Sequence, residues 1–109
     1  MNIQYYEKDK QLVLKLTEEI DHNTTEKIRR KADYEISRLF PRKVIFDFDS
    51  VTFMDSAGIG LIIGRYKLVS MLGGTLEMRN VKPSIKKIFE MCGLLKIIPI
   101  EEPPIKEVS

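Results

Sequence analysis

The amino-terminal part of the chain contains two short runs in which apolar and polar residues alternate. The apolar positions of these runs are Ile3, Tyr5, Leu12, Leu14 and Leu16. Successive side chains of a strand point to opposite faces, so each run is typical of a strand with one buried face. The charged segment Lys8-Asp9-Lys10 lies between the two runs. The pattern therefore predicts an amino-terminal β-hairpin.

The stretch from Val44 to Leu72 combines a strand pattern with a helix pattern. It begins with β-branched and aromatic residues at 44–48, which are typical of a strand buried on both faces. Further on, apolar residues return at the spacing of one helix face: Ile59, Ile62, Ile63, Tyr66 and Val69. Asp55-Ser56-Ala57-Gly58 lies between the two patterns. We therefore expect the Ser56 hydroxyl to be exposed at a helix N-terminus.

A further helix is predicted on each side of this stretch. Asn23 followed three residues later by Glu26 resembles a capping box, which places a helix start near residue 23. The apolar residues of this first helix, which Pro41 ends, are Ile28, Ala32, Ile36, Leu39 and Phe40. The later helix begins at Pro83 and ends at Gly93, with an apolar face made of Ile85, Ile88, Phe89 and Cys92.

The remaining carboxy-terminal elements are short. Gly73-Gly74 breaks the chain before an alternating strand at residues 75–78. Residues 97–100 read Ile-Ile-Pro-Ile and are expected to form an edge strand, because a proline is tolerated there. Residues 101–109 include Pro103-Pro104 and are expected to form a loose or weakly docked tail.

The order of these elements predicts the α/β fold class. Strand-helix-strand units join parallel neighbours through right-handed crossovers, which place helices on the faces of the sheet. We expect a single domain over residues 1–109, with a mixed, mostly parallel sheet of about five strands, an amino-terminal hairpin and three to four helices. Loops after the carboxyl ends of such strands commonly bind ligands. The loops at 21–24 and 55–58 are therefore expected to form one surface.

Composition limits the compartment and the partners. The chain has 109 residues, a formal net charge of +2 and a single cysteine, Cys92. One cysteine excludes an internal disulfide, and no apolar run reaches the ~20 residues of a membrane span. The amino terminus has no apolar signal region. The sequence predicts a soluble cytoplasmic protein, and its net charge is too small to argue for a nucleic acid or membrane partner.

One interpretation of the central loop is a nucleotide site. Gly58, Gly60 and Gly64 follow a strand and are superficially similar to a dinucleotide-binding fingerprint. Asp55, however, places a carboxylate where a pyrophosphate would need positive potential. Gly60 and Gly64 are more simply explained if they allow the helix backbone to lie close to the sheet.

Two interpretations require chemistry by the chain itself. A serine hydrolase with Ser56 as nucleophile would have to use His22, the only histidine, and Met54 stands where the nucleophile elbow has its first glycine. A receiver-like acceptor would take a phosphate on Asp47 or Asp49 with Mg²⁺. These two carboxylates lie two residues apart on one strand, whereas that chemistry needs several carboxylates at one strand end.

A regulatory interpretation is that Ser56 accepts a phosphate from a kinase. A hydroxyl at a helix N-terminus is accessible, and the helix dipole and unpaired N–H groups would stabilise its phosphate. From local chemistry alone, a simple N-cap role explains Ser56 more readily, because serine and aspartate both accept N–H bonds from the first helical turn. The residue pattern leaves both interpretations open.

The residues around Ser56 resemble the signature of a known family. The segment Phe53-Met54-Asp55-Ser56-Ala57-Gly58-Ile59-Gly60, followed by residues 61–67, is similar to that of the STAS domain (sulfate transporter and anti-sigma factor antagonist). Residues 19–24, Gly73-Gly74 and residues 84–94 resemble other family segments in order and spacing. The resemblance covers residues 3 to 100 and is greatest to the anti-sigma factor antagonists of sporulation.

The resemblance implies a partner-switching protein that is not itself an enzyme. The unphosphorylated form of such an antagonist binds an anti-sigma factor that is also a serine kinase, which releases a sporulation sigma factor. The kinase uses ATP to phosphorylate the serine that matches Ser56, and a serine phosphatase reverses the change. By position, the partner-binding residues would be Asp21, His22, Thr24, Asp55, Ser56, Ala57, Gly58 and Ile59.

The resemblance also implies that the protein needs no cofactor or metal and is a monomer when free. It implies no contact with nucleic acid or membrane. A stress-response antagonist of the same family is the near alternative, and a non-phosphorylated scaffold of the same fold is the distant one. A nucleotide-binding domain that uses the turn at Gly58, Gly60 and Gly64 is the alternative from a different class.

Overall fold

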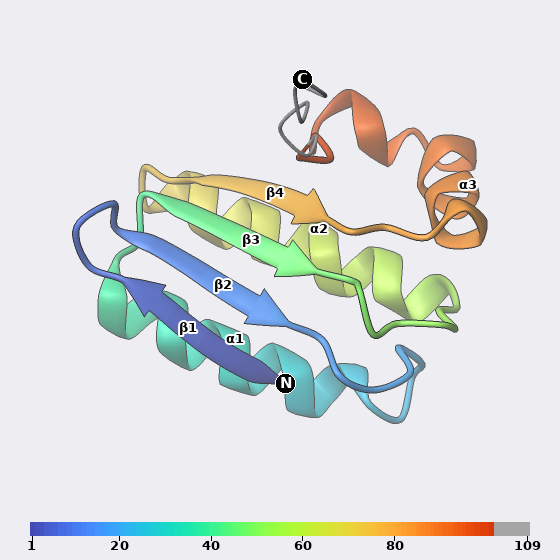
Figure 1. The fold of residues 1–109 in the computed structure, drawn as a ribbon, viewed down its shortest axis with the longest axis horizontal. Coiled ribbons are helices and arrows are strands. Elements are labelled where there is room, and N and C mark those ends of the chain that lie inside the picture. The colour runs from blue at the N-terminus through green and yellow to red at the C-terminus, as the bar shows by residue number, and fades with distance from the viewer. Residues whose placement is uncertain (102–109) are drawn as a thin grey trace, which may run out of the picture.

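Four strands and three helices form the part of the chain that the computed structural model describes, residues 1–101 (Figure 1). The strands are β1 (Asn2–Tyr6), β2 (Gln11–Lys15), β3 (Lys43–Asp47) and β4 (Thr75–Arg79). The helices are α1 (Thr25–Leu39), α2 (Ser56–Met71) and α3 (Pro83–Met91), and a 3₁₀ turn, η1, follows at Leu94–Lys96. The predicted α/β class and amino-terminal hairpin are confirmed.

The sheet is mixed, with the strand order β1-β2-β3-β4. β1 pairs antiparallel with β2, whereas β2, β3 and β4 are parallel neighbours. Because both crossovers are right-handed and move across the sheet in the same direction, α1 and α2 lie on the same face. Figure 1 shows both helices behind the sheet, with α3 beyond the end of β4. The expectation of helices on the faces of the sheet therefore holds for one face only.

The two faces of the sheet are buried in different ways. Leu14 and Phe46 point into the main core beneath the helices and are fully buried. Val13 and Ile45 point to the open face, yet they are also buried, with Gln4 opposite Val13 and Glu77 opposite Ile45 on the neighbouring strands. The prediction that the central strand is buried on both faces is thus confirmed. None of the helices within residues 1–101 has the length and apolar character that crossing a membrane requires.

The predicted edge strand at residues 97–100 is reduced to a single bridge between Ile100 and Met78. The Met78 N–H donates to the Pro99 carbonyl at 3.0 Å, and the Glu101 N–H donates to the Met78 carbonyl at 2.6 Å. The next donor of a parallel ladder would be the N–H of residue 99, which proline lacks. The sheet therefore has four strands instead of about five. The predicted tail falls, apart from Glu101, outside the described residues.

The capping box predicted at Asn23 and Glu26 does not form, because α1 begins later. Its N-cap is Thr24, and no side chain accepts a cap hydrogen bond there. Glu26 instead faces the next turn, with its Oε1 2.5 Å from Arg29 Nη2 and 3.1 Å from Arg30 Nε. The hydrogen bond from Arg29 lowers the pKa of the Glu26 carboxyl.

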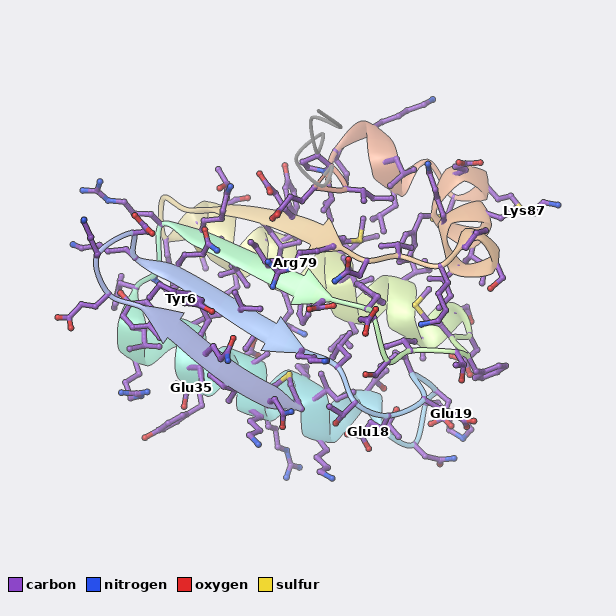
Figure 2. All side chains as sticks on the ribbon, viewed as in Figure 1. Tyr6, Glu18, Glu19, Glu35, Arg79 and Lys87 are labelled. Carbon is purple, nitrogen blue, oxygen red and sulfur yellow. The ribbon has the colours of Figure 1, made fainter. Side chains whose placement is uncertain are left out.

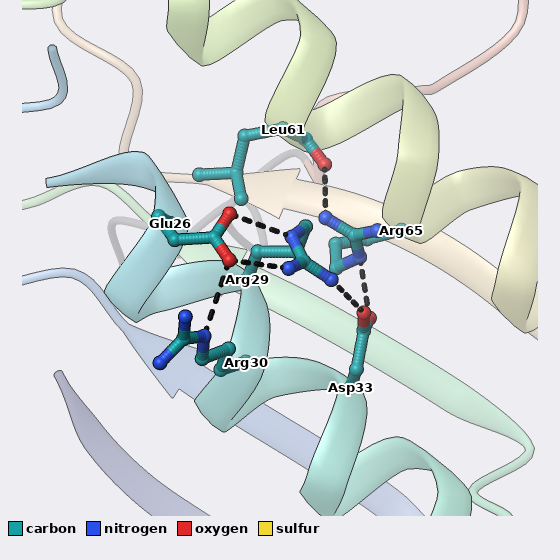
Figure 3. Close-up of polar contacts among 6 residues, drawn as sticks. All are labelled: Glu26, Arg29, Arg30, Asp33, Leu61 and Arg65. Atoms are coloured by element: carbon teal, nitrogen blue, oxygen red, sulfur yellow. Dashed lines mark hydrogen bonds and ion pairs between the residues drawn. The ribbon is translucent and has the colours of Figure 1, made fainter. Parts of the chain in front are cut away.

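An ion pair joins α1 to α2 within their contact (Figure 3). Arg65 Nε lies 2.6 Å from Asp33 Oδ1, and Arg65 Nη1 donates to the Leu61 carbonyl at 3.3 Å. Arg65 is buried, and this desolvation lowers the pKa of its guanidinium. Arg29 Nη1 lies 3.5 Å from the other carboxylate oxygen of Asp33. Asp33 therefore holds charges from both helices and ties the helices together.

Candidate functional site

The two loops that precede α1 and α2 are joined by backbone hydrogen bonds. Ile20 and Met54 form a parallel bridge. The Ile20 N–H donates to the Phe53 carbonyl at 3.1 Å, and the Asp55 N–H donates to the Ile20 carbonyl at 3.0 Å. These bonds lie beyond the carboxyl ends of β2 and β3, where the chain turns into each helix. The residues that surround Asp21 and Ser56 therefore lie side by side at one end of the sheet.

Asp55, not Ser56, caps α2. Its backbone is extended, with φ −102° and ψ −173°, and its Oδ1 accepts the Ala57 N–H at 2.8 Å. Ser56 is the first helical residue, and it is exposed. Within the described residues, its hydroxyl makes no hydrogen bond. The simple N-cap role for Ser56 is therefore wrong, and the hydroxyl is free at the start of the helix.

Among the residues that the structure describes, the Thr24 hydroxyl, in the turn before α1, is hydrogen-bonded, unlike that of Ser56. Thr24 Oγ1 accepts the Asp21 N–H at 3.0 Å and donates to the Glu19 carbonyl at 2.7 Å. Asp21 Oδ1 accepts the N–H groups of Asn23 at 2.8 Å and Thr24 at 3.0 Å. Thr24 and Asp21 thus fix the turn before α1, which explains why the helix does not begin at Asn23.

The three glycines of α2 have different surroundings. A Cβ on Gly58 would lie 2.4 Å from Met54 Cγ and 3.0 Å from Ile20 Cγ2, whereas a Cβ on Gly60 or Gly64 would meet nothing within 4 Å. The expectation that Gly60 and Gly64 bring the helix close to the sheet is therefore wrong. The closely packed glycine is Gly58, two residues before Gly60, and it is buried against the side chains of the bridged residues Met54 and Ile20. Gly58, the first of the three glycines that resemble a dinucleotide-binding fingerprint, is covered by the side chains of Met54 and Ile20.

The carboxylate of Asp47, the last residue of β3, has structural partners. Asp47 Oδ1 accepts the Asp49 N–H at 2.9 Å and Asn80 Nδ2–H at 3.1 Å. Arg79 Nη2 lies 3.6 Å from Asp47 Oδ2 on the open face of the sheet, where Figure 2 labels Arg79. Asp47 is only 8% exposed. Within residues 1–101, no cluster of three His, Cys, Asp or Glu could hold a metal, which argues against a receiver-like acceptor.

The hydrolase interpretation also lacks its geometry. His22 is exposed in the turn before α1. No hydrogen bond among the described residues joins His22 to Ser56, although a serine nucleophile requires an adjacent base.

Phe53 is a surface residue that the sequence pattern does not reveal. Its side chain is 49% exposed, although Val51 and Met54 on either side are buried. Phe53 and Met54 are adjacent apolar residues in the sequence, and this pattern alone does not show which of them is buried. The bridge at Ile20 turns Met54 inward and leaves Phe53 at the surface, three residues before Ser56.

Two of the three loops that follow the parallel strands at this end carry acidic residues and no basic ones, whereas the third, after β4, contains Lys82, whose Nζ donates to the Asp49 carbonyl. Residues 16–24 and 48–55 contain no Lys or Arg, whereas their acidic residues are Glu18, Glu19, Asp21, Asp49 and Asp55. Figure 2 shows Glu18 and Glu19 on the loop that follows β2. The whole chain has a net charge of +2, so the remaining residues carry +7 against −5 on the loops. The Ser56 end is therefore an acidic surface with an exposed aromatic side chain.

Known proteins share both sequence and fold with this chain. The family model of the STAS domain matches residues 2–105. The anti-sigma F factor antagonist of Paenibacillus polymyxa is 37% identical over 89 residues, which are 82% of this chain and 76% of that protein. The structure of the anti-sigma factor antagonist SpoIIAA in its unphosphorylated form has a TM-score of 0.79 and 28% identity, covering 93% of this chain and 87% of that one. The structure of the Bacillus cell fate determinant SpoIIAA in its phosphorylated form has a TM-score of 0.71 and 28% identity, covering 93% and 90%.

Proposed function

The chain belongs to the STAS domain family, and from this premise we propose that it is an anti-sigma factor antagonist that phosphorylation of Ser56 switches off. The observation that carries the proposal is the exposed Ser56 hydroxyl, which has no partner within the described residues because Asp55 caps the helix. Relatives named as anti-sigma F factor antagonists support it, as do phosphorylated and unphosphorylated structures of SpoIIAA.

In the unphosphorylated state the protein binds an anti-sigma factor that is also a serine kinase, and a sporulation sigma factor is thereby released. The partner-binding residues are Asp21, His22, Thr24, Asp55, Ser56, Ala57, Gly58 and Ile59. Within this set, Gly58 is buried and Thr24 is half-buried, and both act by shaping the loops. The Thr24 hydroxyl is hydrogen-bonded within the turn before α1, and Gly58 leaves room for the Met54 side chain.

The chain supplies only the acceptor in the phosphorylation step. A bond forms between Ser56 Oγ and the γ-phosphorus of ATP, the bond to the β-phosphate oxygen breaks, and ADP leaves. The kinase provides the base that takes the hydroxyl proton and the groups that bind ATP. A serine phosphatase later hydrolyses the phosphate ester. The protein itself is thus a cytoplasmic regulator, monomeric when free, and not an enzyme.

The phosphate would separate the partners by charge. It adds about −1.5 to −2 charges beside Asp55, on a surface that is already acidic. In the free protein the N-terminus of α2 stabilises this charge by ~0.3–1 kcal/mol, so the fold tolerates it. In the complex the phosphate must be desolvated beside Asp55, against a position that accepts a neutral hydroxyl, and a buried charge without a partner typically costs about 2–5 kcal/mol. A cost of ~3 kcal/mol would weaken binding more than about a hundredfold.

The test is to incubate the purified protein with its cognate anti-sigma kinase and ATP and to map added phosphate by mass spectrometry. We expect one phosphate, on Ser56. Ser56→Ala should remain unmodified, and Ser50→Ala is the matched control because Ser50 is an exposed serine in the same loop. Stoichiometric phosphate on Ser56→Ala would mean that the acceptor lies elsewhere.

A further inference from the structure

Phe53 is the exposed phenylalanine of the Ser56 end. Half of its side chain is exposed, although a buried aromatic side chain contributes much of the energy of a core. The other exposed phenylalanine, Phe40, directly follows the last residue of α1. Since α1 begins at the Ser56 end and is roughly 22 Å long, Phe40 lies at the far end of that helix. The chain therefore offers two exposed phenylalanines at opposite ends of the fold.

The backbone at Phe53 is held in place by its hydrogen bond with Ile20, so the position of Phe53 on the surface is defined before a partner binds. The Ile20 N–H donates to the Phe53 carbonyl, and the flanking Val51 and Met54 are buried. The backbone of such a segment loses little freedom when a partner covers it, which lowers the ordering cost of binding. Three residues span at most about 11 Å, so Phe53 lies within one contact patch of Ser56.

We propose that Phe53 is the aromatic anchor of the partner surface and inserts into an apolar pocket on the anti-sigma factor. This inference rests on the proposed function, because the occupant is the partner that also reaches Ser56. Aromatic residues near the centre of an interface commonly carry most of its binding energy, within a polar rim that excludes water. Here the rim includes two acidic loops without Lys or Arg, with Lys82 beside Asp49 at its edge. The complementary surface is therefore an apolar pocket with basic residues around it.

The experiment compares Phe53→Ala with Phe40→Ala by calorimetric titration of the purified anti-sigma kinase in the presence of ADP, which prevents phosphate transfer. We expect Phe53→Ala to weaken binding about thirtyfold, as an interface anchor does, and Phe40→Ala to change it less than about twofold. Phe53→Leu retains apolar volume and should lose less affinity than Phe53→Ala. Amide spectra of the free variants check that each one is folded. If Phe53→Ala does not fold, the affinity of Phe53→Leu is compared with that of the wild-type chain instead.

The outcomes separate this inference from the proposed function. Suppose that the wild-type chain binds the kinase and is phosphorylated on Ser56, and that Phe53→Ala and Phe53→Leu bind with the wild-type affinity. The anchor is then overturned and the proposed function stands. If the wild-type chain neither binds nor is phosphorylated, both are overturned. A loss of affinity in Phe53→Ala that Phe40→Ala matches would also overturn the anchor, because the effect would not depend on position.

Discussion

Helices α1 and α2 begin side by side at the same end of the sheet, and each start combines an aspartate with a hydroxyl residue. At α1, Asp21 accepts two backbone N–H groups, and the Thr24 hydroxyl is bonded to the backbone of the same turn. At α2, Asp55 accepts the Ala57 N–H, and the Ser56 hydroxyl makes no bond within residues 1–101. The same residue types therefore produce a closed turn in one place and a free hydroxyl in the other.

The difference depends on the position of the hydroxyl residue relative to the aspartate. Thr24 lies three residues after Asp21, so its side chain can fold back onto the Asp21 N–H. Ser56 comes directly after Asp55, and the capping bond passes over it to Ala57. A hydroxyl beside a cap is left for other chemistry, whereas a hydroxyl that closes the turn contributes to the stability of the fold.

The largest effect should come from Gly58→Val, which would push α2 away from the bridge that joins the two helix starts. A Cβ at residue 58 would lie 2.5 Å from Met54 Sδ, and Met54 is 4% exposed, so it has little room to move. We expect a loss of ~2–3 kcal/mol, the upper part of the usual cost of overpacking. Urea unfolding monitored by circular dichroism would measure it.

Gly60→Ala is the matched control for that substitution. Its Cβ would enter open space, and replacing glycine by alanine inside a helix stabilises by about 0.5–1 kcal/mol. Equal destabilisation by the two variants would mean that the contact of residue 58 with Met54 does not hold α2 in place.

Thr24→Val should show the next largest effect. Valine has the shape of threonine without the hydroxyl, so the Asp21 N–H and the Glu19 carbonyl would lose their partner. We expect a loss of ~1–2 kcal/mol in the free energy of unfolding. Thr52→Val provides the control, because Thr52 is exposed and its hydroxyl makes no bond in the part of the chain described. Identical stabilities would show that water replaces both bonds of Thr24.

Asp55→Ala should cost somewhat less, ~1 kcal/mol, as the loss of an N-cap typically does. Asp55→Asn retains a side-chain oxygen for the Ala57 N–H and should recover most of the difference. Thermal unfolding of both variants would show this ordering. If Asp55→Asn is as unstable as Asp55→Ala, the charge at the start of α2 matters more than the capping bond.

Periodicity predicted the elements of this fold, and on α1 and α3 it also predicted most of the buried face. Ile28, Ala32 and Ile36 are buried on α1 at the predicted spacing, and Ile85 and Phe89 are buried on α3. On α2 the buried residues are Gly58, Leu61, Ile62, Arg65 and Val69, of which only Ile62 and Val69 belong to the predicted face. The loops around Ser56 could be predicted to meet, because parallel strands place their carboxyl ends together. Those inferences use properties that repeat along the chain.

The wrong predictions depend on single contacts between distant residues. The capping box at Asn23 does not form because Asp21 accepts the Thr24 N–H and fixes the turn before α1. The predicted fifth strand is reduced to one bridge because Pro99 has no N–H to donate. The glycine facing the sheet was misassigned by one half-turn or more, because only the position of Met54 distinguishes Gly58 from Gly60. The exposure of Phe53 could not be predicted for the same reason, since the bridge of Met54 to Ile20 decides which member of the apolar pair is buried.

The smallest effect on stability should come from Ser56→Ala, and this is the sharpest test of the comparison. Both Ser56→Ala and Thr24→Val remove one hydroxyl at a helix start, so any difference between them reports what each hydroxyl does in the free fold. Since Asp55 supplies the cap and the Ser56 hydroxyl has no partner within residues 1–101, we expect a change within about 0.5 kcal/mol, as for ordinary surface substitutions. Alanine also favours the helix slightly more than serine does. Parallel urea titrations of the two variants would measure the contrast. A loss for Ser56→Ala as large as that for Thr24→Val would show that the Ser56 hydroxyl holds the fold together, and the two helix starts would then be alike.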